Sequence, residues 1–190
     1  MASHSQRPEG ERLVVGITGR IGSGKTTVGR YLESKYRFQY LRYSEVLAEW
    51  RVKDPESKAQ LQKVGWEVMA GGMQAELNRR LIARITPDAD VAVDGLRHPL
   101  DHETLNKFFS FSFRLVYLDS PPEMRFDRLN QAGRYPDLAS FEEADSHAVE
   151  QQIDSLQAKA ARVIRNEGSL QNLYGVVDEA ILTFRKEGQS

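Results

Sequence analysis

The stretch Gly19-Arg20-Ile21-Gly22-Ser23-Gly24-Lys25-Thr26 fits the pattern G-x-x-x-x-G-K-[ST]. An apolar run over residues 13–17 precedes it, and a pattern typical of a helix over residues 28–36 follows it. The order is therefore strand, loop and helix, which is the context that a phosphate-binding loop requires. A chance match in a chain of this length has odds of about one in 150.

Each residue type in this loop has a physical task in binding a polyphosphate. Gly22 and Gly24 let successive backbone N–H groups turn inward, and the N-terminus of the following helix adds partial positive charge. Lys25 is expected to reach the β- and γ-phosphates, and the Thr26 hydroxyl is expected to hold Mg²⁺. The residues predicted to bind ATP are Gly19, Gly22, Ser23, Gly24, Lys25, Thr26 and Thr27.

The composition excludes several classes of protein. The 190 residues, 40% hydrophobic and 28% charged, can bury a sizeable core in one domain. A net charge of -1 argues against a general attraction to nucleic acid or membranes, and the absence of cysteine excludes disulfides and thiolate sites. The four histidines have no metal-ligand spacing. We interpret residues 1–12 as a flexible leader and expect a cytoplasmic monomer or small homo-oligomer.

Short apolar runs alternate with longer amphipathic stretches over residues 13–190, which favours βα units around a parallel sheet. The expected strands cover residues 13–18, 38–42, 90–94, 113–119 and 161–165. We predict one α/β domain with the three-layer fold of P-loop nucleoside triphosphatases, in which helices cover both faces of a five-stranded parallel sheet.

The expected helices include two long ones. Ser44 is expected to cap a short helix, and a long helix over residues 54–81 follows it. Gly71 and Gly72 interrupt this pattern and could mark a kink or the close approach of a substrate. A charged helix is expected over residues 141–159, and residues 119–149 are the natural place for a small helical lid.

Polar residues at the carboxyl ends of the strands are candidates for chemistry, because ligands collect there in an open parallel sheet. Asp94 follows an apolar strand and can complete the Mg²⁺ shell begun by Thr26, or it can simply cap the next helix. Arg97 comes three residues later and can hold a phosphate with two hydrogen bonds.

Arg42, Ser44 and Glu45 end the second expected strand, on the side where a phosphoryl acceptor would lie. A phosphate acceptor is already ionised and needs cations such as Arg42 and Arg97, whereas a hydroxyl acceptor benefits from a base such as Glu45. The sequence leaves both kinds of acceptor possible. The alternative is that Arg42 and Glu45 are only solvated charges at the end of a strand.

Arginines on the expected lid and a turn after the last strand complete the candidates. Arg128 and Arg134, and with less support Arg125, could close over a transferring phosphoryl group. Asn166 and Gly168 could present backbone groups to an adenine edge, although a simple strand-to-helix turn explains the same residues. The candidate catalytic residues are Lys25, Asp94, Arg97, Arg128 and Arg134.

These motifs resemble a known group of kinases. Residues 17–28, ITGRIGSGKTTV, look like the opening of dephospho-CoA kinases, which belong with adenylate kinase and other nucleoside monophosphate kinases. Residues 93–97, VDGLR, resemble a segment of nucleotide kinases and of archaeal and bacterial kinase-like proteins of unassigned substrate. Residues 116–119, VYLD, and 163–170, VIRNEGSL, are similar to the fourth strand and the adenine-side segment of such kinases. The resemblance implies ATP, Mg²⁺ and a closing lid.

Two departures from these families bear on the acceptor. Dephospho-CoA kinases carry two aspartates flanking one residue where this chain has Tyr43-Ser44-Glu45, and adenylate kinases have a proline where Leu96 stands. We therefore predict an ATP- and Mg²⁺-dependent kinase with a nucleoside or deoxynucleoside monophosphate as the favoured acceptor. Dephospho-CoA is the alternative acceptor. A regulatory ATPase acting through a protein partner is the alternative of another class.

Overall fold

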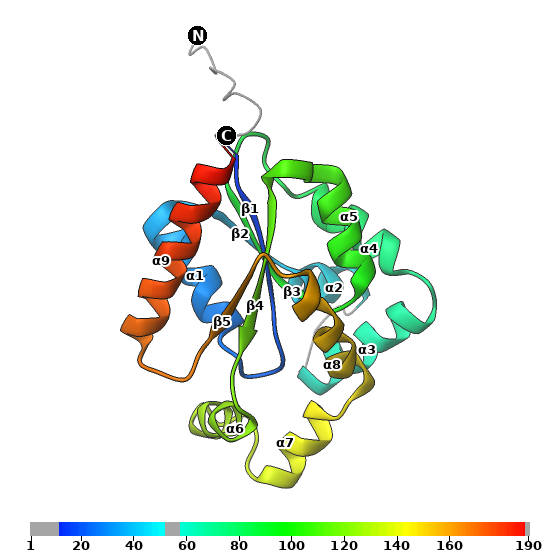
Figure 1. Ribbon diagram of the computed structural model, residues 1–190. Coiled ribbons are helices and arrows are strands. Elements are labelled where there is room, and N and C mark those ends of the chain that lie inside the picture. The colour runs from blue at the N-terminus through cyan, green and yellow to red at the C-terminus, as the bar shows by residue number, and fades with distance from the viewer. Residues whose placement is uncertain (1–11, 52–57, 189–190) are drawn as a thin grey trace.

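A computed structural model describes residues 12–51 and 58–188, and Figure 1 shows a sheet between two layers of helices. The strands are β1 (Val14–Thr18), β2 (Gln39–Arg42), β3 (Val91–Leu96), β4 (Phe113–Asp119) and β5 (Arg162–Arg165). Every neighbouring pair is parallel, and the order across the sheet is β2-β3-β1-β4-β5. The predicted five-stranded parallel sheet is confirmed.

The central strand explains why the apolar runs predicted the sheet well. All five residues of β1 are buried, because helices cover both faces of the strand. The expected strand ends differ from the observed ones by at most two residues, and the largest difference is at β3, which continues past Asp94 to Leu96. Since β1 lies between β3 and β4, the strand order changes direction at its carboxyl end, where ligands bind in such sheets.

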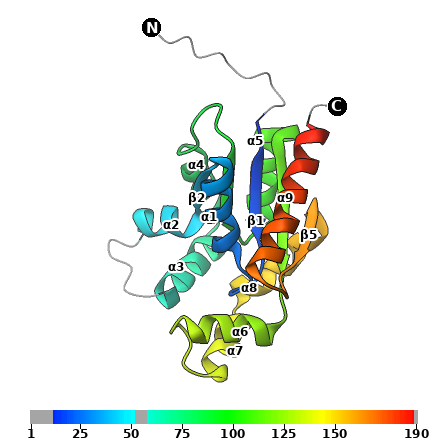
Figure 2. The same cartoon turned by 90° about the vertical axis from the view of Figure 1, so that its left-hand side faces the viewer.

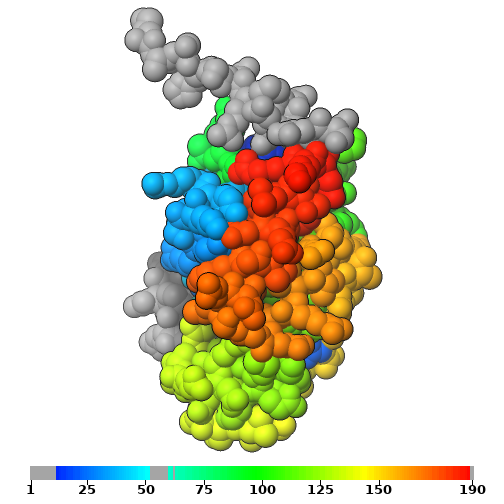
Figure 3. All heavy atoms as spheres, turned by 60° about the vertical axis from the view of Figure 1, so that its left-hand side comes forward, coloured from blue at the N-terminus to red at the C-terminus, as the bar shows by residue number. Residues whose placement is uncertain are grey.

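Two apolar clusters hold the helices against the sheet. On one face, α1 (Lys25–Tyr36) and α9 (Leu170–Glu187) pack against the strands through residues such as Leu32 and Val177. Figure 3 shows α9 running along this side of the molecule. The other face is covered by α2 (Tyr43–Arg51), α3 (Lys58–Ala70), α4 (Gln74–Ile82), α5 (Pro99–Phe109) and the 3₁₀ helix η2 (Asp154–Lys159). A short 3₁₀ turn, η1 (Ser110–Ser112), leads into β4.

Three expectations about helices are wrong. The helix expected over residues 54–81 is divided into α3 and α4, because Gly72 adopts a φ of 69° that a continuing helix does not allow. Its expected start at residues 54–56 lies outside the described residues. The helix expected over residues 141–159 is divided into the end of α7 (Leu138–Asp145), α8 (Ala148–Ile153) and η2. Ser44 lies inside α2, which begins one residue earlier, so it does not cap that helix.

The segment expected to form a lid lies at one end of the molecule. Figures 1 and 2 both place α6 (Pro122–Gln131) and α7 below the carboxyl ends of the strands. The two helices pack through Phe126 and Phe141, whose ring centroids are 5.7 Å apart.

Within residues 12–51 and 58–188, no helix combines the length and the apolar character that crossing a membrane requires.

Candidate active site

The loop between β1 and α1 has the backbone that phosphate binding needs. Gly19, Gly22 and Gly24 have φ angles of 139°, 79° and 102°, which residues with side chains rarely adopt. At Gly19 a Cβ would lie only 2.4 Å from the carbonyl oxygen of Leu118. The local backbone therefore requires these glycines, and α1 begins directly after Gly24 with its N-terminus at the loop.

The ammonium group of Lys25 points into the same loop. Its Nζ donates hydrogen bonds to the carbonyl oxygens of Gly19, at 2.6 Å, and Arg20, at 2.9 Å. In loops of this pattern the lysine accompanies the β- and γ-phosphates. The predicted contact of Lys25 with a triphosphate is consistent with this orientation of its side chain.

Asp94 lies in β3, where it is almost fully buried and pairs in register with Ile17 of β1. Its Oδ2 accepts hydrogen bonds from Thr26 Oγ1, at 3.1 Å, and from the Tyr40 hydroxyl, at 2.7 Å. Burial and the negative charge of Asp94 raise the pKa of Tyr40, so the phenol stays protonated as a donor. The pairing of β1 with β3 therefore brings together the two residues that we predict hold Mg²⁺.

Of the three residues expected on the acceptor side, Arg42 lies next to this carboxylate. Arg42 Nε is 3.7 Å from Asp94 Oδ2, and Arg42 Nη1 donates to Glu45 Oε1 at 3.2 Å. In the described structure the buried Nε of Arg42 has no hydrogen-bond partner. Ser44 lies in the first turn of α2, and Glu45 is exposed beside it.

A buried carboxylate fixes the backbone at Arg97, which lies between β3 and α5. Asp101 accepts hydrogen bonds from the N–H groups of Arg97 and His98, both at 3.0 Å, and from Gln74 Nε2 at 2.5 Å. Burial raises the pKa of Asp101, and the hydrogen bonds oppose that rise. The Arg97 guanidinium itself pairs with Glu150 of α8, which was not among the expected site residues.

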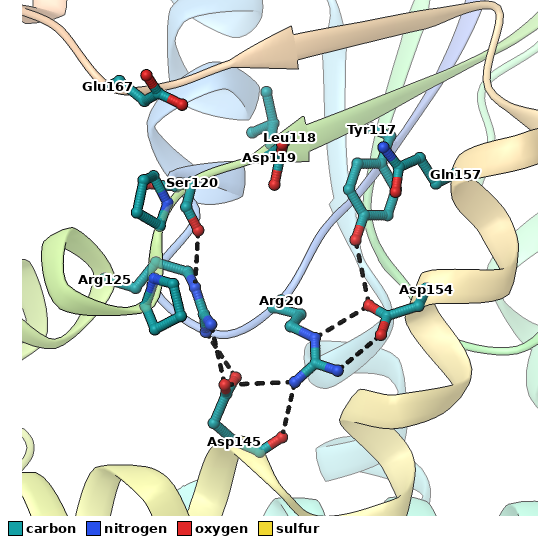
Figure 4. Close-up of a pocket in the computed structure, with 12 residues that line it drawn as sticks. Arg20, Tyr117, Leu118, Asp119, Ser120, Arg125, Asp145, Asp154, Gln157 and Glu167 are labelled. Carbon is teal, nitrogen blue, oxygen red and sulfur yellow. Dashed lines mark hydrogen bonds and ion pairs between the residues drawn. The ribbon is translucent and has the colours of Figure 1, made fainter.

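A pocket of about 470 Å³ lies beside the loop, and Figure 4 shows the charged residues that cross it. Arg20 donates to Asp154 through Nε, at 2.9 Å, and Nη2, at 2.6 Å, while its Nη1 lies 3.3 Å from Asp145 Oδ2. Arg125, only 3% exposed, donates to both oxygens of Asp145 at 2.5 and 2.9 Å. These ion pairs tie the phosphate loop and α6 to the end of α7 and tie the loop to η2.

Arg128 and Asn166 connect α6, the turn after β5 and the loop. Arg128 donates to Ser120 Oγ at 2.8 Å and to the carbonyl oxygen of Asn166 at 2.7 Å, and burial lowers its pKa. Asn166 Nδ2 in turn donates to the carbonyl oxygen of Ser23 at 2.9 Å. Arg128 thus lies against the turn predicted to face adenine.

The remaining expected residues are more exposed. Arg134 is exposed at the turn after α6, where its backbone N–H donates to the carbonyl oxygen of Leu129 at 2.9 Å. Gly168 is exposed on the turn before α9, and Thr27 is partly buried in the first turn of α1.

Sequence reasoning missed several residues that the structure brings to the loop, among them Arg20, Tyr40, Asp145 and Glu150. Arg20 had a signal, because it is a charged residue within the phosphate-binding pattern. Nothing in the sequence indicated Asp145 or Glu150, since they fall in a charged stretch that is typical of the solvated side of a helix.

Comparisons with known proteins agree with this architecture. A family model described as AAA domain matches residues 15–150. A UPF0200 protein of Pyrobaculum aerophilum is 29% identical over 181 residues, which cover 90% of this chain and 98% of the relative. A dephospho-CoA kinase of Thermus thermophilus is 32% identical over 113 residues, 57% of this chain and 52% of the relative.

A solved structure with the same fold is the APS kinase of Mycobacterium tuberculosis in complex with AMPPNP and APS. It superposes with a TM-score of 0.60 at 16% identity and covers 90% of this chain and 98% of its own. The chain is thus similar to P-loop kinases in fold and, over part of its length, to a dephospho-CoA kinase in sequence. The match over residues 15–150 shows that the chain belongs to the AAA domain family.

Proposed function

We propose that the chain is an ATP- and Mg²⁺-dependent kinase that moves the γ-phosphoryl group of ATP to a small nucleotide-like acceptor, with a nucleoside or deoxynucleoside monophosphate favoured. The observation that carries the proposal is the position of Asp94. Its Oδ2 lies 3.1 Å from Thr26 Oγ1 on the ATP side and 3.7 Å from Arg42 Nε on the acceptor side. One carboxylate thus stands where the two halves of a phosphoryl-transfer site would meet.

The donor set around Asp94 fits Mg²⁺. This ion prefers oxygen ligands and is commonly bound by one or two carboxylates together with substrate phosphates. Thr26 and Asp94 offer a hydroxyl and a carboxylate oxygen and would hold the ion. Bound there, Mg²⁺ would offset the negative charge of the β- and γ-phosphates.

The proposed phosphoryl transfer requires little covalent catalysis by the protein. Lys25 and the loop N–H groups would orient ATP, while Arg42 and Arg97 would bind the acceptor phosphate. The bond between the γ-phosphorus and the β-γ bridging oxygen breaks, its electron pair leaves with ADP, and an acceptor oxygen forms the new bond. Since a phosphate acceptor is already ionised, positioning and charge stabilisation supply most of the rate. Residues 119–149, with the exposed Arg134, would close as a lid that excludes water.

Dephospho-CoA is the second candidate acceptor, favoured by the relative from Thermus thermophilus. In that case Glu45, which is exposed beside Arg42, would accept the proton of the attacking hydroxyl. The departure at residues 43–45 weighs against this reading.

A panel of acceptors tests the proposal. ADP release is measured with each nucleoside and deoxynucleoside monophosphate and with dephospho-CoA, and the products are identified by ³¹P NMR. We expect one monophosphate to stimulate ADP release and yield the diphosphate, and Lys25→Ala to abolish both. A 3′-phosphorylated product from dephospho-CoA would favour the second candidate. Stimulation by a protein alone would contradict the kinase proposal.

A further inference from the structure

Glu150 joins the two halves of the candidate site through a single carboxylate. Its Oε2 accepts the backbone N–H of Ile21, in the phosphate loop, at 2.8 Å. Its Oε1 forms an ion pair with Nη1 of Arg97, the residue expected to clamp the acceptor. The side chain of Glu150 is 0% exposed, so both oxygens are committed inside the protein.

The fold leaves this carboxylate little freedom. Glu150 lies in α8 between Val149 and Ile153, which are both buried. His147 caps α8 by accepting the N–H of Val149 at its Nδ1, and its ring packs edge-on against Trp66 of α3. The helix therefore holds the carboxylate at a set position relative to the loop.

The contact leaves part of the Arg97 guanidinium available. The Arg97 side chain is 33% exposed, and the described residues supply Glu150 as the hydrogen-bond partner of its Nη1. The guanidinium presents its donors in a planar fork, so fixing one nitrogen orients Nε and Nη2 as well. Two such nitrogens can bind one phosphate with parallel hydrogen bonds.

We propose that Glu150 is a positioning residue that sets the distance and orientation of Arg97 relative to the phosphate loop, and this rests on the proposed kinase function. With Glu150 in place, an acceptor phosphate on Arg97 is presented to the γ-phosphate at a defined separation. Glu150 does not compete with ATP for the loop, because leaving its buried site would break its contacts with both the Ile21 N–H and the Arg97 guanidinium.

Two substitutions distinguish the effect of the charge of Glu150 from the effect of its side-chain length. Glu150→Gln keeps an oxygen for Ile21 but turns an amide toward Arg97. Glu150→Asp keeps the charge and shortens the side chain by one methylene. We expect Glu150→Gln to lower kcat/KM for the acceptor by about tenfold to a hundredfold, as losing a hydrogen bond to a charged group does. The Kd of an ATP analogue should change by less than about threefold, and Glu150→Asp should recover part of the activity.

Glu179→Gln on α9 is the matched control, because Glu179 is exposed and lies outside the proposed lid, so removing its charge should leave all these constants unchanged. Equal losses in ATP binding and acceptor use by Glu150→Gln would indicate a merely structural role and overturn the proposal. Tighter ATP binding with faster turnover would show that the carboxylate competes with phosphate, which also overturns it.

NMR provides a readout that does not depend on turnover. In the wild type the Arg97 guanidinium protons should show the shifts of a hydrogen bond to a carboxylate, and Glu150→Gln should remove them. The Ile21 amide proton keeps an oxygen partner in this variant and should shift less. If no acceptor is phosphorylated but these shifts change as expected, the kinase proposal fails while the link between Arg97 and the loop stands. Unchanged shifts would refute the link itself.

Discussion

Replacing Gly29 with alanine should destabilise the protein although the substitution favours helix formation. Gly29 is buried in α1 beneath the ring of Tyr40, and a Cβ at this position would lie 2.1 Å from Tyr40 Cε2 and 2.6 Å from Cζ. Carbon atoms in contact stay about 3.5–4.0 Å apart, so the ring must move by more than about 1 Å. Because the Tyr40 hydroxyl donates to Asp94, the movement reaches the proposed Mg²⁺ ligand.

The size of the effect follows from three contributions. Alanine in place of glycine within a helix adds about 1 kcal/mol of stability. Overpacking costs about 1–3 kcal/mol, and losing the hydrogen bond to Asp94 costs about 1.5–3 kcal/mol. The net loss in the free energy of unfolding is then about 1.5–5 kcal/mol, and at about 2–4 °C per kcal/mol Tm falls by at least about 3 °C.

Gly175→Ala is the matched control, because Gly175 is exposed in α9 and a Cβ there meets nothing within 4 Å. Urea and thermal unfolding followed by circular dichroism should show this variant more stable by up to about 1 kcal/mol. In Gly29→Ala/Tyr40→Ala the clash is absent, so the alanine at position 29 should stabilise relative to Tyr40→Ala alone. If Gly29→Ala stabilises as much as Gly175→Ala, Tyr40 does not pack on α1 as described.

Three further predictions concern charged and polar contacts. Arg97→Lys should lower kcat/KM for the acceptor by about tenfold or more, because lysine cannot bind a phosphate with two parallel hydrogen bonds. An equal loss of ATP affinity, measured by calorimetry, would place Arg97 on the ATP side. Asn166→Ala should weaken ATP binding and lower the free energy of unfolding by about 1–2 kcal/mol, since it unpairs the Ser23 carbonyl; Asn172→Ala, at an exposed position on α9, should change neither. The hydrogen bond from Arg20 lowers the pKa of Asp154 in the folded protein, so this contact stabilises the fold at neutral pH. The stabilisation is lost as the pH falls from about 4, the pKa of an aspartate in the unfolded chain, through the lower pKa of Asp154 in the folded protein. The Tm difference between wild type and Asp154→Asn should therefore shrink below about pH 4, and a difference that persists there would contradict the assignment.

Much of the fold could be predicted from local pattern. The three central strands, β1, β3 and β4, are apolar runs that are almost entirely buried, so each can be recognised in the sequence without reference to the others. Helix ends were harder: the break at Gly72 depends on a left-handed backbone, and a sequence pattern shows only that glycine permits it. The division at residues 146–147 has no comparable signal, because the same charged stretch would suit one continuous helix.

The candidate site divides in the same way. The loop and the pairing of Thr26 with Asp94 could be expected, since the pattern is contiguous and the carboxyl ends of parallel strands meet at one edge. The partners of the arginines could not be expected. Arg20 and Arg97 bind Asp145, Asp154 and Glu150, and those acids reach them only because the end of α7, α8 and η2 fold back on the loop.

The sequence alone therefore determined a phosphate-binding loop at the end of a central parallel strand, because that signal consists of neighbouring residues with fixed backbone needs. The tertiary structure decided which charges face one another across the site. Whether Glu150 is a solvated surface acid or a buried link between the loop and Arg97 depends on distance and burial. Both are properties of long-range packing, which local sequence pattern does not contain.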